Sequence, residues 1–178
     1  MKRIIYFLAF AIVAVALLPG CQQAPKEKKA KYVFYFIGDG MGVNQVNGTE
    51  MYLAEKEGRI GLKPLNFPQF PVTNFATTYS KYNAVTCSAA AGTALATGTK
   101  TKNGTIGMDS LRRDPLYSVA VQAKKAGKKV GITTSVSVDH ATPAAFYAHQ
   151  PDRNMYYEIA TDLPKTGFDL YAGGGFLQ

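Results

Sequence analysis

The chain has 178 residues, of which 47% are hydrophobic and 18% are charged, which is the composition of one modest globular domain rather than of a disordered protein. Its formal net charge is +8, but no basic cluster interleaved with aromatic residues predicts a nucleic-acid surface. The chain has two cysteines, Cys21 and Cys87. If Cys21 carries a lipid, as argued next, Cys87 has no partner and a disulfide framework is excluded.

The N-terminus has the features of an export signal. Lys2 and Arg3 precede an apolar run over residues 4–18, which is too short to span a membrane comfortably. The run ends in a proline and a glycine followed by Cys21, which resembles the site where a bacterial lipoprotein is cleaved and acylated. An ordinary secretory signal cleaved nearby, or an uncleaved anchor, remains an alternative. All three place the rest of the chain outside the cytoplasm.

We therefore expect three regions. Residues 1–20 form a lipoprotein-type signal peptide, residues 21–31 form a polar, lysine-rich tether, and residues 32–178 form the folded domain. The expected location is the cell envelope, with Cys21 holding the domain on the periplasmic or extracellular face of a bacterial membrane.

The predicted elements alternate between strands and helices. The strands are expected at residues 31–37, 72–79, 129–135 and 168–175. The helices are expected at residues 43–57, 88–98, 115–126 and 154–163, with a further one starting at Thr142 as N-cap and Pro143 as first helical residue. This alternation predicts an α/β fold: a doubly wound, mostly parallel sheet flanked by helices.

A glycine-rich turn containing Asp39 follows the first predicted strand. Active sites of open α/β sheets gather at the carboxyl ends of strands. The spacing is not that of a dinucleotide-binding loop, because Val43 stands where the last glycine would be. A carboxylate here suits a metal ligand. The plain alternative is an ordinary turn with a solvated aspartate.

Ser88 stands at the start of the predicted alanine-rich helix. Free backbone N–H groups and the helix dipole favour an anion at that end, so a phosphate could lie beside the hydroxyl. Serine is also a favoured helix cap, and the residue alone does not distinguish the two roles.

Three further residues are candidates downstream. His140 and Thr142 follow a predicted strand, and Arg153 has a guanidinium that could bind two phosphate oxygens. The alternatives are a hydrogen-bonded loop histidine, a capping threonine and a solvated surface arginine.

Together these segments resemble the alkaline phosphatase family. The resemblance rests on Asp39 to Gly42, on Val85 to Thr93 around Ser88, on Thr97 to Gly107, and on His140 to Ala144 followed by Arg153. These four segments occur in the family's order and at matching spacing. They extend over about residues 31 to 178.

The resemblance implies phosphomonoester hydrolysis through a phosphoserine, with two zinc ions and one magnesium ion as cofactors. Ser88 and Arg153 are then the catalytic residues. Asp39, Ser88, His140 and Thr142 are the expected metal ligands. Inorganic phosphate is the implied product, and a homodimer is possible by analogy.

The family takes most of its zinc ligands from a later half of the chain, and zinc needs about four ligands. We therefore expect these residues to be the N-terminal part of a longer protein, with the sheet incomplete at the C-terminus and little activity in the 178-residue chain alone. The competing hypothesis is a non-catalytic, lipid-tethered remnant that binds phosphate or metal weakly. A sulfatase or phosphodiesterase is disfavoured, because Cys87, Ser88 and Ala89 lack the expected proline and arginine context of a sulfatase.

One departure from the family pattern generates a prediction. Cys87 replaces the acid that precedes the nucleophile, which removes a negative charge near the phosphate. In the native protein, Cys87→Asp is expected to weaken inhibition by inorganic phosphate, measured as the inhibition constant. An unchanged constant would contradict this. A cysteine that binds metal or acts as a rival nucleophile is the alternative, and full activity of Ser88→Ala would favour it.

Overall fold

The computed structural model describes residues 30–177, so the expected signal peptide, Cys21 and most of the tether lie outside the described residues. The chain divides into two units, Met1–Ile37 and Gly38–Gln178, and each is described by itself. Within residues 30–177, no helix combines the length and the apolar character needed to cross a membrane.

The elements of the second unit follow the predicted order in part. They are α2 (Val43–Glu55), η1 (Phe67–Gln69), α3 (Ser88–Thr97), α4 (Val119–Lys125), β1 (Gly131–Thr133), α5 (Ala141–Ala144), α6 (Tyr156–Asp162), η2 (Leu163–Thr166) and β2 (Leu170–Ala172). Helix α3 ends at Gly98, whose backbone is left-handed with φ of 76° and reverses the direction of the chain.

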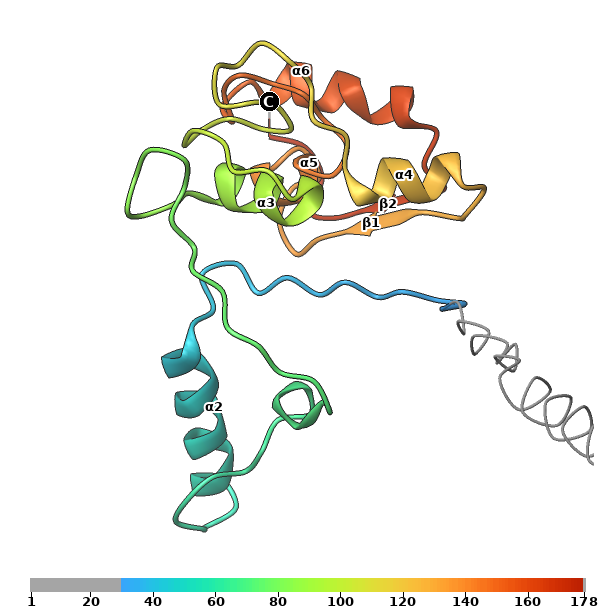
Figure 1. Ribbon diagram of the computed structural model, residues 1–178. Helices are drawn as coiled ribbons and strands as arrows, with labels where there is room; N and C mark the ends of the chain where they lie inside the picture. The colour runs from blue at the N-terminus through green and yellow to red at the C-terminus, as the bar shows by residue number, and fades with distance from the viewer. Residues whose placement is uncertain (1–29, 178) are drawn as a thin grey trace, which may run out of the picture. The chain divides into compact units, whose positions relative to one another are not determined.

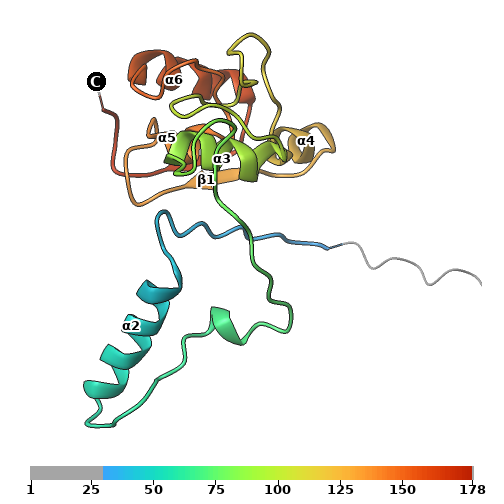
Figure 2. The ribbon, with the colours of Figure 1, turned by 60° about the vertical axis from the view of Figure 1, so that its left-hand side comes forward.

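The described sheet is a parallel pair. Ile132 of β1 stands opposite Tyr171 of β2, and the connection between the strands contains α5 and α6. Figure 1 shows the two strands side by side, and Figures 1 and 2 both show α4 and α6 on the same side of β1. This arrangement of parallel strands and flanking helices confirms the predicted α/β class.

Asp169 joins the start of this pair to α4. Its carboxylate accepts from the backbone N–H of Val130 at 2.9 Å and from the ammonium groups of Lys124 and Lys129 at 2.8 and 2.9 Å. These contacts hold the pKa of Asp169 well below its ordinary value. The side chain therefore fixes where β2 begins against β1.

Two predicted strands are not formed. Residues 31–37 and 72–79 have no strand assignment, and most of their side chains are exposed, including Phe36 at 87% and Phe75 at 87%. A strand needs a neighbour to complete its ladder of hydrogen bonds. Among the residues that the structure describes, the sheet consists of β1 and β2, so the strand-forming composition of these two segments is not expressed.

Two predicted helix starts were also wrong. The helix expected from Pro115 begins at Val119, because the Ser118 hydroxyl accepts from the backbone N–H of Val121 at 3.2 Å, while Pro115 forms an isolated antiparallel bridge with Met108. In α5 the cap is His140, so Thr142 lies inside the helix and its hydroxyl is available for other contacts.

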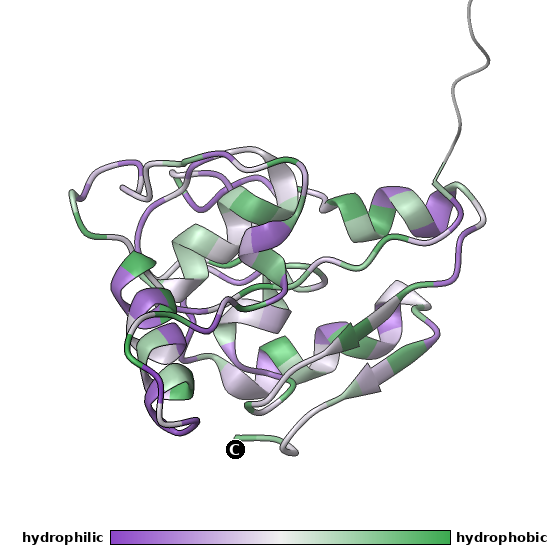
Figure 3. Ribbon diagram, turned by 90° about the horizontal axis from the view of Figure 1, so that it is seen from below, coloured by the Kyte–Doolittle hydropathy of each residue, from purple (hydrophilic) through white to green (hydrophobic). Residues whose placement is uncertain are grey.

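The core is built largely from small side chains. A buried cluster joins α3, α5 and α6 with the loop that carries Ile106. Its members are Ala89, Ile106, Val138, Ala141, Ala144, Tyr147, Ala148, Ile159 and Leu163. Figure 3 colours both strand arrows partly green, as expected of strands with an apolar face. Alanines keep α3 and α5 close to each other, which matters for the site below.

A glycine in the core generates a stability prediction. Gly107 has φ of 56°, and a Cβ placed there would lie 2.0 Å from the carbonyl oxygen of Ala148. Gly127 has a similar φ of 74° but open space around it. Gly127→Ala is expected to lower the free energy of unfolding by about 1–2 kcal/mol through backbone strain alone. Gly107→Ala should cost roughly 1–3 kcal/mol more because it adds a backbone clash.

Urea denaturation of the two variants and of the parent chain measures both changes. Equal losses for the two variants would mean that the contact between Gly107 and Ala148 is not tight.

Candidate active site

Asp39 lies in the glycine turn and connects two distant parts of the chain. Gly40 is left-handed with φ of 68°, and Met41 N donates to the carbonyl oxygen of Gly38, so the backbone reverses around the aspartate. The exposed carboxylate accepts from the Ser88 hydroxyl at 3.2 Å and from the Thr142 hydroxyl at 2.8 Å. One carboxylate therefore bridges two hydroxyl groups from different helices.

Ser88 is the first residue of α3, and it is not the cap. Cys87 occupies the cap position with an extended backbone, φ −110° and ψ 166°. The Ser88 hydroxyl is consequently not used in capping and donates to Asp39 instead. A hydroxyl at the N-terminal end of α3 lies where the helix dipole favours negative charge.

His140 and Arg153, two further predicted site residues, contact each other. A guanidinium nitrogen of Arg153 lies 3.5 Å from His140 Nε2. His140 Nδ1 is buried and has no hydrogen-bond partner among residues 30–177. Because Thr142 follows His140 in α5, the helix brings both predicted groups to the same region.

The second histidine has a different place. His149 Nδ1 donates to the carbonyl oxygen of Gly107 at 2.7 Å, and its ring lies edge-on to Tyr117. It lines a cavity of about 310 Å³ together with Lys124 and Tyr147. This histidine is a structural link between two loops and does not contact the predicted site residues.

The described residues include oxygen donors of the kind that bind hard cations. The carboxylate of Asp39 and the hydroxyls of Ser88 and Thr142 are oxygen donors, which suit a hard cation such as Mg²⁺. Within residues 30–177, no three or more His, Cys, Asp or Glu side chains gather into a metal-binding group. The donor set therefore fits one side of an oxygen-ligated cation and does not by itself complete a zinc site of about four ligands.

The comparisons decide the family. The family model for alkaline phosphatase matches residues 30–171. This chain belongs to the alkaline phosphatase family. It is 39% identical over 146 residues to alkaline phosphatase 4 of Drosophila melanogaster, and the match covers 78% of this chain and 24% of that protein. It is 36% identical over 137 residues to the human tissue-nonspecific isozyme, covering 71% and 26%. The chain thus spans about a quarter of these alkaline phosphatases.

Solved alkaline phosphatases share the fold. The enzyme from the Antarctic bacterium TAB5 superposes with a TM-score of 0.69 at 34% identity, covering 77% of this chain and 37% of that one. The cold-active enzyme of a psychrophilic Shewanella gives the same TM-score at 38% identity, covering 78% and 35%. These likenesses confirm both the family resemblance and the fold class predicted from the sequence.

Sequence reasoning assigned no role to Asn103, which contacts the turn just before Ser88. Its amide oxygen accepts from Cys87 N at 3.3 Å, and its amide nitrogen donates to the carbonyl oxygen of Val85 at 3.0 Å. In the sequence, Asn103 stood out only as one of the residues that resemble the family. An asparagine before a glycine ordinarily signals a turn, so nothing local pointed to this contact.

The Cys87 thiol lies among backbone N–H groups at the start of α3. Its sulfur accepts from Gly104 N at 3.1 Å. Burial alone would raise the pKa of the Cys87 thiol, but the backbone N–H groups of Ala90, Gly104 and Ala89, with the nearby Arg153 charge, outweigh it, so the pKa lies below its ordinary value.

This shift gives a pH prediction. Thiolate is the reactive form, so the rate of iodoacetamide labelling of Cys87 should reach half of its maximum at a lower pH in the folded chain than in urea. A Cys21→Ser variant leaves Cys87 as the single thiol. Mass spectrometry of the labelled peptide measures the rate from pH 5 to pH 10. A folded midpoint at or above the unfolded one would contradict the predicted direction.

Proposed function

We propose that this chain supplies the nucleophile and the phosphate-gripping arginine of a metal-dependent phosphomonoesterase. The observation that carries the proposal is the Asp39 carboxylate, which accepts from the hydroxyls of both Ser88 and Thr142 although these residues lie 49 and 103 positions away in the chain. These two hydrogen bonds bring together residues that are far apart in the sequence and that the family resemblance selects.

The reaction would use Ser88 as the nucleophile. Its Oγ forms a bond to the phosphorus of the ester, and the bond from phosphorus to the ester oxygen breaks, releasing the alcohol. Water then displaces the serine oxygen and releases inorganic phosphate. The proton of the Ser88 hydroxyl points at Asp39 Oδ1, so this carboxylate orients the hydroxyl before attack.

Arg153 would bind the phosphate. Guanidinium groups bind two phosphate oxygens in a fork and stabilise the charge that develops during transfer. The 3.5 Å contact with His140 Nε2 ties the guanidinium to the N-cap residue of α5, the helix that contains Thr142. The half-buried arginine thus has a partner that restricts its position.

The proposed cofactors are two zinc ions and one magnesium ion. Asp39, Ser88 and Thr142 would hold cations through oxygen, and His140, whose Nε2 faces Arg153, would act through water or alter the choice of metal. Such ions lower the pKa of an attacking oxygen and neutralise phosphate charge. One solved relative, a variant of the TAB5 enzyme, is described with Mg bound in its M3 site, which supports a magnesium ion in this family.

The proposed location follows from the N-terminal sequence. Residues 1–20 would direct export, and acylated Cys21 would hold the domain on the outer side of a bacterial membrane through the tether. Globomycin-sensitive processing and palmitate incorporation into the native protein would test this, and a protein secreted without lipid would contradict it.

The nucleophile assignment is tested in the native protein with zinc and magnesium supplied. Ser88→Ala is expected to lower kcat for p-nitrophenyl phosphate by roughly 10³-fold or more, because the covalent route is lost. Brief incubation of the parent protein with substrate at acidic pH should leave a phosphoryl group on the Ser88 peptide. Ser110→Ala, a serine whose Oγ accepts from the Tyr82 hydroxyl at 3.2 Å, is the matched control.

Two results would overturn the proposal. The first is native protein that hydrolyses no phosphomonoester with both metals present, which would favour the non-catalytic remnant. The second is a Ser88→Ala variant as active as the Ser110→Ala control.

A further inference from the structure

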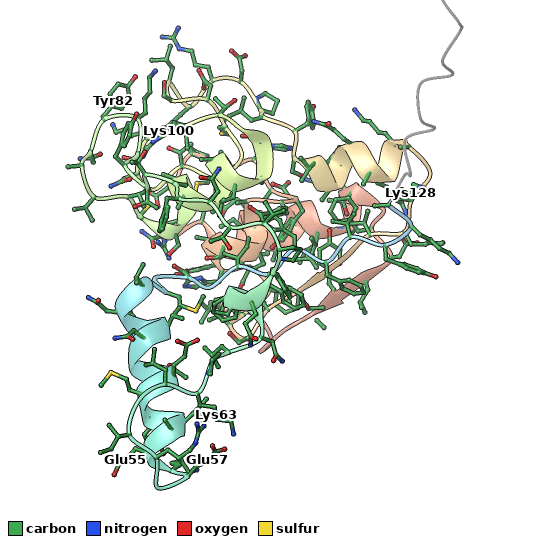
Figure 4. The ribbon with its side chains drawn as sticks, turned by 60° about the horizontal axis from the view of Figure 1, so that its bottom comes forward. Glu55, Glu57, Lys63, Tyr82, Lys100 and Lys128 are labelled. Carbon is green, nitrogen blue, oxygen red and sulfur yellow. The ribbon has the colours of Figure 1, made fainter. Side chains whose placement is uncertain are left out.

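Two loop segments that flank α3 in sequence run beside each other in space. Lys81 N donates to the carbonyl oxygen of Thr101 at 2.9 Å, and the Lys100 ammonium donates to the carbonyl oxygen of Tyr79 at 2.5 Å. Figure 4 shows Tyr82 and Lys100, which come from these two segments, close together. The segment after α3 is therefore placed to contact the segment that leads into it.

The side chain of Asn103 makes this contact at the nucleophile turn. Its amide nitrogen donates to the carbonyl oxygen of Val85, and its amide oxygen accepts from Cys87 N. The side chain therefore binds the backbone on both sides of Thr86, as a neighbouring strand would. Both hydrogen bonds therefore hold residues that lie within three positions before Ser88.

Other contacts fix the position of Asn103 itself. Gly104 N donates to the sulfur of Cys87 at 3.1 Å, and the Arg112 guanidinium donates to the carbonyl oxygen of Asn103 at 3.3 Å and to the Thr105 hydroxyl at 3.0 Å. Arg112 has φ of 60°, an unusual value for a residue other than glycine. The loop therefore holds the backbone of Asn103, and the Asn103 side chain in turn holds residues 85–87.

The direction of the Ser88 side chain depends on this turn. Cys87 is extended and Ser88 is helical, so the chain changes conformation between them. A rotation of the Cys87 backbone would turn the Ser88 hydroxyl away from Asp39. Misplacing a reacting group by about 1 Å can lower a rate by about 10²-fold.

We propose that Asn103 is a positioning residue for the Ser88 nucleophile: it fixes the backbone of residues 85–87 and thereby aims the hydroxyl. Asn103 itself does not bind substrate. The catalytic part of this inference rests on the proposed function, whereas the holding of the turn does not.

Two variants separate the contributions of the amide. Asn103→Leu has a similar size and removes both hydrogen bonds, while Asn103→Asp keeps the acceptor for Cys87 N and loses the donor to Val85. Asn83→Ala is the matched control, because Asn83 is an exposed asparagine of the neighbouring segment whose backbone carbonyl accepts from Ser80 N.

The first measurement follows the turn without catalysis. In the Cys21→Ser background at pH 10, where the Cys87 thiol is largely ionised in every variant and the rate reports access, iodoacetamide should label Cys87 roughly five- to tenfold faster in Asn103→Leu than in Asn83→Ala, because the loss of the two hydrogen bonds frees the turn. Asn103→Asp should fall between them. Labelling at the control rate in Asn103→Leu would overturn the proposal.

The second measurement is made on the native protein with both metals. Asn103→Leu should lower kcat roughly 10- to 100-fold with KM changed less than about threefold, since the residue orients the nucleophile and does not hold the substrate. Asn103→Asp should restore part of kcat. A kcat equal to that of Asn83→Ala, or a loss confined to KM, would overturn the positioning role.

The two readouts distinguish the failures. If the native protein proves inactive, the proposed phosphatase function fails, and unchanged Cys87 labelling then overturns the holding of the turn as well. Fast labelling of Asn103→Leu in an inactive protein would support the holding of the turn and remove its catalytic purpose.

Discussion

The site depends on how closely α3 approaches α5. Gly92 faces α5, and a Cβ at this position would lie 3.0 Å from the Cβ of Ala145 and 3.6 Å from the carbonyl oxygen of Thr142. The helices can touch at this distance because one of them has no side chain at the contact. Ser88 begins one helix and Thr142 belongs to the other, so the same contact sets the separation that a single Asp39 carboxylate bridges.

The loop after α3 adds a second constraint of a different kind. Thr93 of α3 accepts from Gly107 N at 3.0 Å through its buried hydroxyl, and Ile106 pairs with Gln150 in an isolated bridge. The loop is therefore held to α3 on one side and to the segment that leads to Arg153 on the other. Packing fixes the distance between the helices, and hydrogen bonds fix the backbone that enters the first of them.

The sequence predicted elements that carry their own signals. The alanine-rich helix from Ser88 to Gly98 was confirmed, because alanine favours helix and the left-handed glycine ends it. Residues 72–79 have a strand-forming composition too, but a strand also needs a neighbour, and the residues described here provide none for them. The start of α4 was missed because it depends on one cap, the Ser118 hydroxyl, whereas α5 begins after His140, whose side chain makes no capping hydrogen bond.

The candidate site followed from the resemblance and not from local pattern. Ser88, Thr142 and Arg153 each had a plain structural explanation, and only their joint order selected the catalytic one. Asn103 differs, because its partners lie 16 and 18 residues away and its type signals nothing but a turn. Cys87 links the two cases, because its sulfur accepts from the backbone N–H of Gly104, the residue after Asn103. An aspartate at this position would offer a charged acceptor to the same N–H group. The Gly104 N–H group would thus be held by a thiol or by a carboxylate, and only the carboxylate would add a full negative charge near Arg153.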